Sequence, residues 1–113
     1  MNPAEIPAPI SLLVAILAEV VATTCLKAAQ GFTRPLPSLV VVLGYSVAFY
    51  GLSLTLRSLP LGPVYAIWSG LGLLLITAAG WLIWDQRLSG QTLLGMALIV
   101  TGVVVINLGS SSH

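Results

Sequence analysis

The stretch ISLLVAILAEVVATTCLKAA, from Ile10 to Ala29, decides the fold, because it is long and apolar enough to cross a membrane. It carries one carboxylate, Glu19, near its middle. A charged acid at that depth costs roughly 2.5 to 3.5 kcal/mol on insertion scales, and such residues usually mark ion, proton or substrate pathways. Lys27 lies about 12 Å further along the helix axis, too far for a direct pair. We therefore interpret Glu19 as a functional residue.

The whole chain has the composition of a membrane protein. Of its 113 residues 58% are hydrophobic and 6% are charged, whereas about a quarter of the residues of soluble domains are charged. Continuous apolar runs without alternation favour helices over a membrane barrel. We predict an all-α membrane fold with a single four-helix transmembrane domain over residues 1–113 and short loops that make successive helices antiparallel. The predicted helices cover residues 10–29, 37–56, 61–84 and 88–108.

The charges and the single cysteine exclude several classes of function. A net charge of +1 gives no electrostatic basis for binding nucleic acid. Cys25 is the one cysteine, so we predict neither a disulfide framework nor a metal site, and no cofactor. The sequence shows no nucleophile with a matching base and no phosphate-binding loop, which excludes the common enzyme classes.

Positive charges leave the orientation in the membrane open. Lys27, Arg34 and Arg87 belong to one side of the predicted membrane domain, and Arg57 belongs to the other. The positive-inside rule favours placing the first and third loops in the cytoplasm. Because the difference is only two charges, the chain could also insert both ways up.

Glycines recur at seven-residue spacing in two predicted helices. Gly44 and Gly51 share one face of the second helix, and Gly95, Gly102 and Gly109 share one face of the fourth. Such stripes let another helix approach closely. We expect the fourth-helix stripe, with Gly95 and Gly102, to form a dimer interface; ordinary packing within one chain is the alternative.

The third predicted helix combines aromatic rings with glycines. Tyr65, Trp68 and Gly72 share a face. The rings fit a box that surrounds a cation, and they fit an interfacial aromatic belt equally well. Gly70 and Gly72 lie in mid-helix, where paired glycines permit bending, and we interpret them as a hinge.

These features suggest half of a transport site. Four helices are few for alternating access, and a second copy inserted upside down would supply inverted symmetry. Two Glu19 carboxylates would then meet in one chamber, where burial and like charge disfavour ionisation and the pair titrates as a unit. Protons and a cation would compete for that site, which is sufficient for exchange.

Three stretches resemble the small multidrug resistance transporters. Residues 15–20 read AILAEV and are followed by Thr23, Thr24, Lys27 and GFTR at 31–34; Pro60 and Gly62 precede YAIWSGLG at 65–72. Gly95-Met96, Gly102-Val103 and Ile106-Asn107 resemble the fourth helix of that family. The similarity covers nearly the whole chain.

The resemblance implies a proton-coupled exporter in the bacterial inner membrane that works as an antiparallel homodimer by alternating access. It implies that Glu19 is the shared proton and cation site, and that Thr23, one turn along, and Tyr45, which lines the chamber, bind substrate. It implies further that Tyr65 and Trp68 form the aromatic walls. Gly70 and Gly72 would form the kink that lets the protomers exchange shapes.

The resemblance also bears on the substrate. The guanidinium-exporting branch carries a Trp three residues after the glutamate and a Ser in the second helix, where this chain has Ala22 and Ala48. We therefore expect bulkier hydrophobic or quaternary-ammonium cations, with Ala22 among the substrate-binding residues. Three alternatives stay open, namely a subunit of a heterodimeric polyamine-type pair, a guanidinium exporter, and a membrane scaffold or modulatory subunit that transports nothing.

Overall fold

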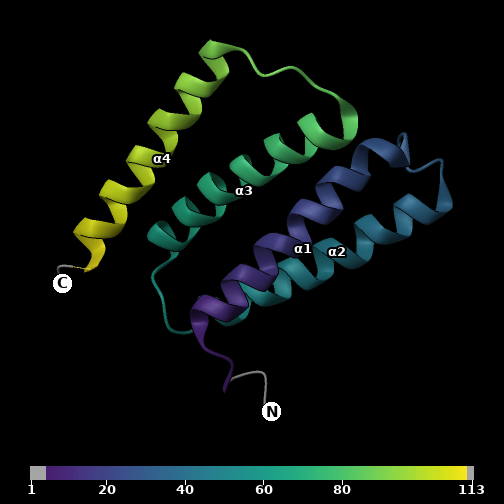
Figure 1. Cartoon of the computed structure of the whole chain (residues 1–113). Helices are drawn as coiled ribbons and strands as arrows, with labels where there is room; N and C mark the ends of the chain where they lie inside the picture. The colour runs from purple at the N-terminus through teal and green to yellow at the C-terminus, as the bar shows by residue number, and fades with distance from the viewer. Residues whose placement is uncertain (1–4, 112–113) are drawn as a thin grey trace. The chain divides into compact units, whose positions relative to one another are not determined.

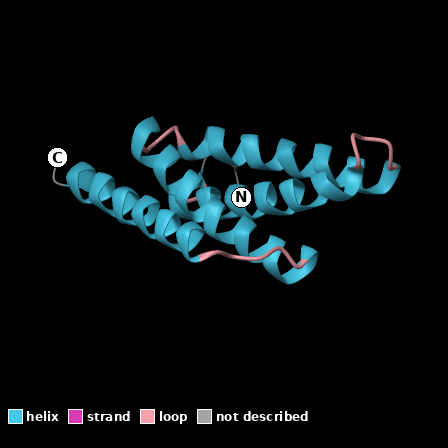
Figure 2. Cartoon of the chain, turned by 90° about the horizontal axis from the view of Figure 1, so that it is seen from above, coloured by secondary structure: helices cyan, strands magenta, loops and turns pink. Residues whose placement is uncertain are grey.

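The computed structural model describes residues 5–111, which form four α-helices joined by short loops (Figures 1 and 2). They are α1 (Ala8–Ala29), α2 (Pro35–Thr55), α3 (Leu61–Trp84) and α4 (Gly90–Ser111). Each of them is long and apolar enough to cross a membrane. The prediction of four membrane-length helices is confirmed; α1 and α2 start two residues earlier than predicted, and α4 starts two residues later.

Prolines and left-handed residues set the ends of the first two helices. Pro9 and Pro35 lie in the first turns of α1 and α2, where the missing N–H breaks no helical hydrogen bond. After α1, Gln30, Gly31 and Phe32 all have positive φ, and the Thr33 N–H returns to the Ala29 carbonyl. The chain therefore reverses within a few residues, as the predicted short loop requires.

The shift of α4 has a local cause. The hydroxyl of Ser89 accepts a hydrogen bond from the backbone N–H of Thr92 at 3.0 Å. A serine in this position caps a helix N-terminus, because it satisfies an N–H that has no partner within the helix. The apolar run begins at Leu88, but the helix begins only after the serine cap.

The helices form two compact units, one of α1 and α2 and the other of α3 and α4, which are described separately. In the first unit α1 and α2 run side by side (Figure 1). A Cβ placed on Gly44 would lie 2.8 Å from the Ala22 Cβ, and one on Gly51 would lie 2.9 Å from the Ala15 Cβ. Both α2 glycines are therefore covered by α1, and their stripe serves packing within the chain.

A buried polar contact joins the ends of the same two helices. The hydroxyls of Ser11 on α1 and Thr55 on α2 lie 2.8 Å apart, and both side chains are buried. Ser11 also contacts the Ala8 carbonyl at 3.0 Å, and Thr55 contacts the Gly51 carbonyl at 2.9 Å. The two hydroxyls carry two protons, so two of these three contacts are hydrogen bonds at one time, and either hydroxyl can donate the one between the helices.

The second unit packs more openly. A Cβ on Gly70 of α3 would lie 2.8 Å from a methyl carbon of Val103 on α4, which marks the close approach of the two helices. A shallow apolar groove of about 170 Å³ runs beside this contact, between residues 67–74 and 100–104. By contrast, a Cβ on Gly95, Gly102 or Gly109 would meet no atom within 4 Å. The α4 stripe is therefore uncovered among the described residues.

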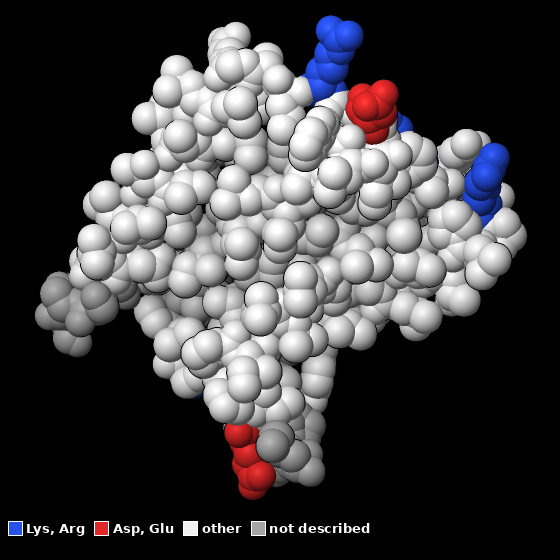
Figure 3. Space-filling model, in the orientation of Figure 1, with Lys and Arg blue, Asp and Glu red and all other residues white. Residues whose placement is uncertain are grey.

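Charged side chains are scarce on the surface. Figure 3 shows a broad face without Lys, Arg, Asp or Glu, and the charged side chains visible there stand at its edges. Large apolar side chains are instead exposed on all four helices, with Leu82 at 73% and Leu98 at 65%. A surface of this kind matches hydrocarbon rather than water as the surrounding solvent.

Candidate cation site at Glu19

Glu19, Thr23 and Tyr45 form a chain of hydrogen bonds between α1 and α2. Thr23 is four residues after Glu19 and lies on the same helix face. Its hydroxyl donates to Glu19 Oε1 at 3.0 Å. The Tyr45 hydroxyl lies 2.6 Å from the same Thr23 oxygen. The structure therefore brings together three of the residues that were predicted to form the site.

The two oxygens of Glu19 have different surroundings. Oε1 accepts the Thr23 hydrogen bond, whereas Oε2 is buried and has no hydrogen-bond partner among the described residues. Buried polar atoms are almost always paired, so an unpaired carboxylate oxygen calls for an explanation. A proton or a bound cation at Oε2 would satisfy it.

Tyr45, the last residue in this series of hydrogen bonds, also contacts an aromatic ring. The rings of Tyr45 and Phe49 lie 6.4 Å apart between centroids at an interplanar angle of 32°. Sequence reasoning did not include Phe49 in the site. The signal was available, because Phe49 follows Tyr45 by four residues and so lies on the same face of α2.

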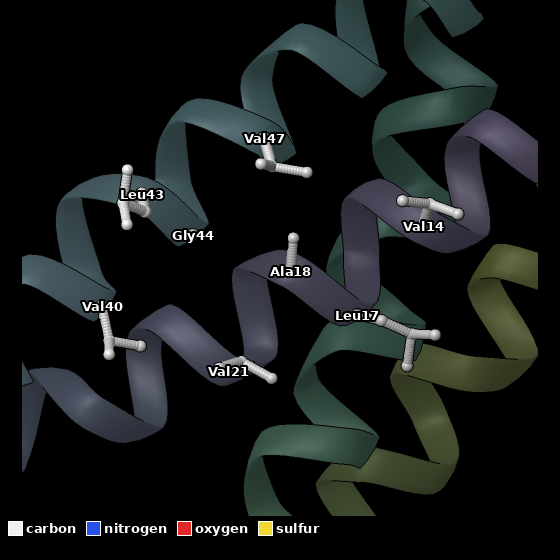
Figure 4. Close-up of a pocket in the computed structure, with 8 residues that line it drawn as sticks. All are labelled: Val14, Leu17, Ala18, Val21, Val40, Leu43, Gly44 and Val47. Carbon is white, nitrogen blue, oxygen red and sulfur yellow. The ribbon is translucent and has the colours of Figure 1, made fainter.

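A large groove between α1 and α2 lies away from these polar groups. It has a volume of about 470 Å³, and its lining is purely apolar (Figure 4). Ala18 and Gly44 line it, where short side chains leave space between the helices. Because no lining side chain carries charge or a hydrogen-bonding group, we do not assign the cation site to this groove.

Comparison with known proteins identifies the family. Residues 8–99 match the profile of the family described as Small Multidrug Resistance protein. The chain belongs to the small multidrug resistance family. It is therefore a multi-pass protein of the bacterial inner membrane.

Individual small multidrug resistance proteins are similar to this chain over most of their length. The quaternary ammonium compound-resistance protein QacE of Escherichia coli is 54% identical over 101 residues, which cover 89% of this chain and 92% of the relative. A multidrug transporter of Pseudomonas aeruginosa is 56% identical over 99 residues, covering 88% and 90%. The multidrug transporter EmrE of Escherichia coli K12 is 47% identical over 98 residues, covering 87% and 89%.

In this small multidrug resistance protein Ala22, which was predicted to bind substrate, lies where α1 packs against α2. It is 0% exposed, and its Cβ faces the backbone of Gly44. Ala48 is also fully buried. The methyl group of Ala22 thus makes a packing contact in the structure, and its contact with substrate stays a prediction.

The remaining predicted site residues of this family member lie on α3 and α4. Tyr65 is 60% exposed and Trp68 is half-buried. Gly70 and Gly72 lie inside α3, which runs without interruption from Leu61 to Trp84. The aromatic walls and the hinge therefore stay predictions, as does the dimer interface at Gly95 and Gly102.

Proposed function

We propose that this small multidrug resistance protein is a proton-coupled antiporter that exports hydrophobic or quaternary-ammonium cations. The observation that carries the proposal is the state of Glu19, whose Oε1 is held by Thr23 while Oε2 is buried and unpaired. A carboxylate in that situation binds either a proton or a cation, because each removes the cost of an unpaired buried charge.

Exchange follows from this competition. A cation that reaches the ionised carboxylate from the cytoplasm is carried outward, and protons that enter from outside displace it. The inward movement of each proton's charge contributes about 2.3 kcal/mol per 100 mV of membrane potential. Reorientation of only the occupied site keeps the two movements coupled.

The surroundings of Glu19 favour cations without N–H donors. A guanidinium ion binds a carboxylate best through two parallel hydrogen bonds, which need both oxygens. Here Oε1 already accepts one hydrogen bond from Thr23, so a guanidinium ion would have to share that oxygen with the Thr23 hydroxyl. Ala22 and Ala48 add no hydrogen-bonding side chain. A quaternary-ammonium ion needs only charge, shape and ring faces, and the similar protein QacE is named for resistance to such compounds.

The proposal includes a second copy of the chain in antiparallel orientation. Two copies would bring two Glu19 side chains to one chamber, and Tyr65 and Trp68 would supply its aromatic walls. The uncovered stripe of Gly95 and Gly102 on α4 supports a close helix contact between copies. Gly70 and Gly72 would then absorb the bending that exchanges the two protomer shapes.

The test is proton movement in proteoliposomes that contain the purified protein. Adding tetraphenylphosphonium or benzalkonium should drive proton movement with the wild-type chain, and guanidinium should drive little. Glu19→Gln should abolish the response. Glu5→Gln is the matched control, because Glu5 is exposed and precedes α1. An unchanged response in Glu19→Gln would overturn the proposal, and a response to guanidinium alone would overturn the substrate class.

A further inference from the structure

We propose that Thr23 positions the Glu19 carboxylate so that Oε2 alone receives the proton or the cation, and that Tyr45 acts through Thr23. This inference rests on the proposed function and deepens it. It replaces direct substrate contact, which the family resemblance implied for Thr23 and Tyr45, by a positioning role. Cation and proton then compete for one atom of Glu19 and not merely for one residue.

The direction of the hydrogen bonds follows from counting protons. Thr23 has one hydroxyl proton, and it is given to Glu19 Oε1 because an ionised carboxylate only accepts. Thr23 therefore has none left for Tyr45. The 2.6 Å contact must then be a hydrogen bond from the Tyr45 hydroxyl to the Thr23 oxygen. Both hydroxyls are polarised toward Glu19, and hydrogen bonds in such a series strengthen one another.

The Tyr45–Thr23–Glu19 hydrogen bonds determine which oxygen of the Glu19 carboxylate is exposed to ligands. The terminal torsion of a glutamate side chain is soft, so a carboxylate without a fixed partner presents either oxygen. The Thr23 hydrogen bond stops this exchange by holding Oε1. A proton on Oε2 leaves the Tyr45–Thr23–Glu19 chain unchanged. A proton on Oε1 would have to reverse both hydrogen bonds.

Because Thr23 binds Oε1 and the ligand binds Oε2, removing the Thr23 hydroxyl should change the selectivity of the site between two kinds of cation. In Thr23→Val, Oε1 loses its donor, and a guanidinium ion, which donates to both carboxylate oxygens, can replace the lost hydrogen bond without competing with the Thr23 hydroxyl. Tetraphenylphosphonium has no N–H group and cannot replace the lost hydrogen bond. The ratio of the two affinities should therefore move toward the guanidinium ligand, and a general loss of structure would lower both affinities together.

The experiment measures binding of tetraphenylphosphonium and phenylguanidinium to the full-length protein in bilayers, by calorimetry, at a pH where proton competition is weak. Thr23→Val should bind tetraphenylphosphonium about tenfold more weakly, which corresponds to one hydrogen bond to a charged group. The affinity ratio should shift by at least as much. Thr23→Ser keeps the hydroxyl and should show the wild-type ratio. It therefore separates loss of the hydroxyl from misfolding as the cause of the effect in Thr23→Val.

Thr24→Val is the matched control. Its hydroxyl donates to the Val20 carbonyl at 2.7 Å within α1 and is not part of the Glu19 chain. It should leave the affinity ratio unchanged. An equal loss for both ligands in Thr23→Val would overturn the proposal, as would a failure of Thr23→Ser to restore the ratio.

Tyr45 is tested in a double-mutant cycle. Tyr45→Phe should weaken tetraphenylphosphonium binding in the wild-type chain and have no further effect in Thr23→Val. An equal effect in both backgrounds would show that Tyr45 contacts substrate directly and would overturn its part of the proposal. The two proposals fail separately, because a chain that still needs Glu19 for transport but shows no Thr23 effect loses only the positioning role.

Discussion

Glu19 shows how much of a site's chemistry rests on the partners of single atoms. In solution the two oxygens of a carboxylate are equivalent, but here one accepts from Thr23 and the other is buried without a partner among the described residues. The expected role of Glu19 came from its depth in an apolar helix. The distinction between its oxygens came only from the structure.

The spacing of residues accounts for part of this arrangement. Thr23 came from the family resemblance, but it lies four residues after Glu19 on the same helix face, and the structure places its hydroxyl 3.0 Å from Glu19 Oε1. Tyr45 lies on another helix, and its role came from the family resemblance alone. No rule of spacing gives the rotation of α2 against α1, because that depends on which small residues meet at the seam.

A second polar contact gives a prediction for single residues. Thr55→Val should lower the free energy of unfolding by about 0.6 to 1 kcal/mol, because it removes the buried interhelical hydrogen bond between Thr55 and Ser11. The measurement is reversible unfolding in mixed micelles. Ser46→Ala should have almost no effect, since that exposed hydroxyl bonds only within α2. An equal loss of unfolding free energy in both variants would show that the Ser11–Thr55 contact does not stabilise the fold.

At the scale of elements, small residues determine how α1 and α2 pack. The seam of α2 repeats at three- and four-residue spacing through Val41, Gly44, Ala48, Gly51 and Thr55, which is a heptad pattern. All of these except Gly44 are buried, and Gly44 is half-buried. The glycines were recognised from the sequence, but the rest of the repeat, including Ala48 between them, was not. The complete repeat would have predicted an intrachain partner for this face.

Helix ends were more predictable than helix partners. α3 runs from Leu61 to Trp84, as predicted, because Pro60 precedes it and polar residues follow it. Local chemistry decides such ends. Helix partners depend on shape over the whole length of two helices, which a single glycine spacing does not specify.

The contact between α1 and α2 gives a prediction for Gly44, which can be compared with a helix glycine that has no close neighbour. Gly44→Ala should lower the free energy of unfolding by about 1 to 2 kcal/mol, because the new Cβ would lie 2.8 Å from the Ala22 Cβ and 3.1 Å from the Ala18 carbonyl oxygen. Neither atom can rotate away, so the helices must separate. Far-UV circular dichroism during unfolding in mixed micelles measures the change.

Gly62→Ala on α3 is the control for that substitution. Its new Cβ would meet no atom within 4 Å, and alanine favours a helix over glycine by up to about 1 kcal/mol. The protein should therefore keep or gain stability. If Gly44→Ala and Gly62→Ala behave alike, close packing of α1 on α2 does not limit stability.

At the scale of the whole molecule, the few charges decide how the chain is inserted. Four antiparallel helices place the first and third loops on one side of the membrane and the second loop on the other. The positive charges near those loops are Lys27, Arg34 and Arg87 against Arg57. So small a difference leaves the orientation open, and the proposed antiparallel homodimer needs both orientations.

Forcing the orientation tests the assembly. Arg57→Ser leaves three positive charges against none and should fix the first and third loops in the cytoplasm. Replacing Lys27, Arg34 and Arg87 by Ser and adding Ser58→Lys and Leu59→Lys gives the reverse ratio and should fix the opposite orientation. Fluorescent and phosphatase fusions at the C-terminus report the orientation obtained. Each fixed form alone should lose cation resistance in cells, because it lacks an inverted partner, and co-expression of both should restore it.

The wild-type chain expressed alone is the reference for this experiment. Resistance from wild type alone excludes the need for a different partner subunit, since only one kind of chain is present. Full resistance from either fixed form alone would contradict antiparallel assembly, because two parallel copies would then suffice. Restoration only on co-expression would place two inverted Glu19 side chains in one working unit, as the proposed antiparallel pair predicts.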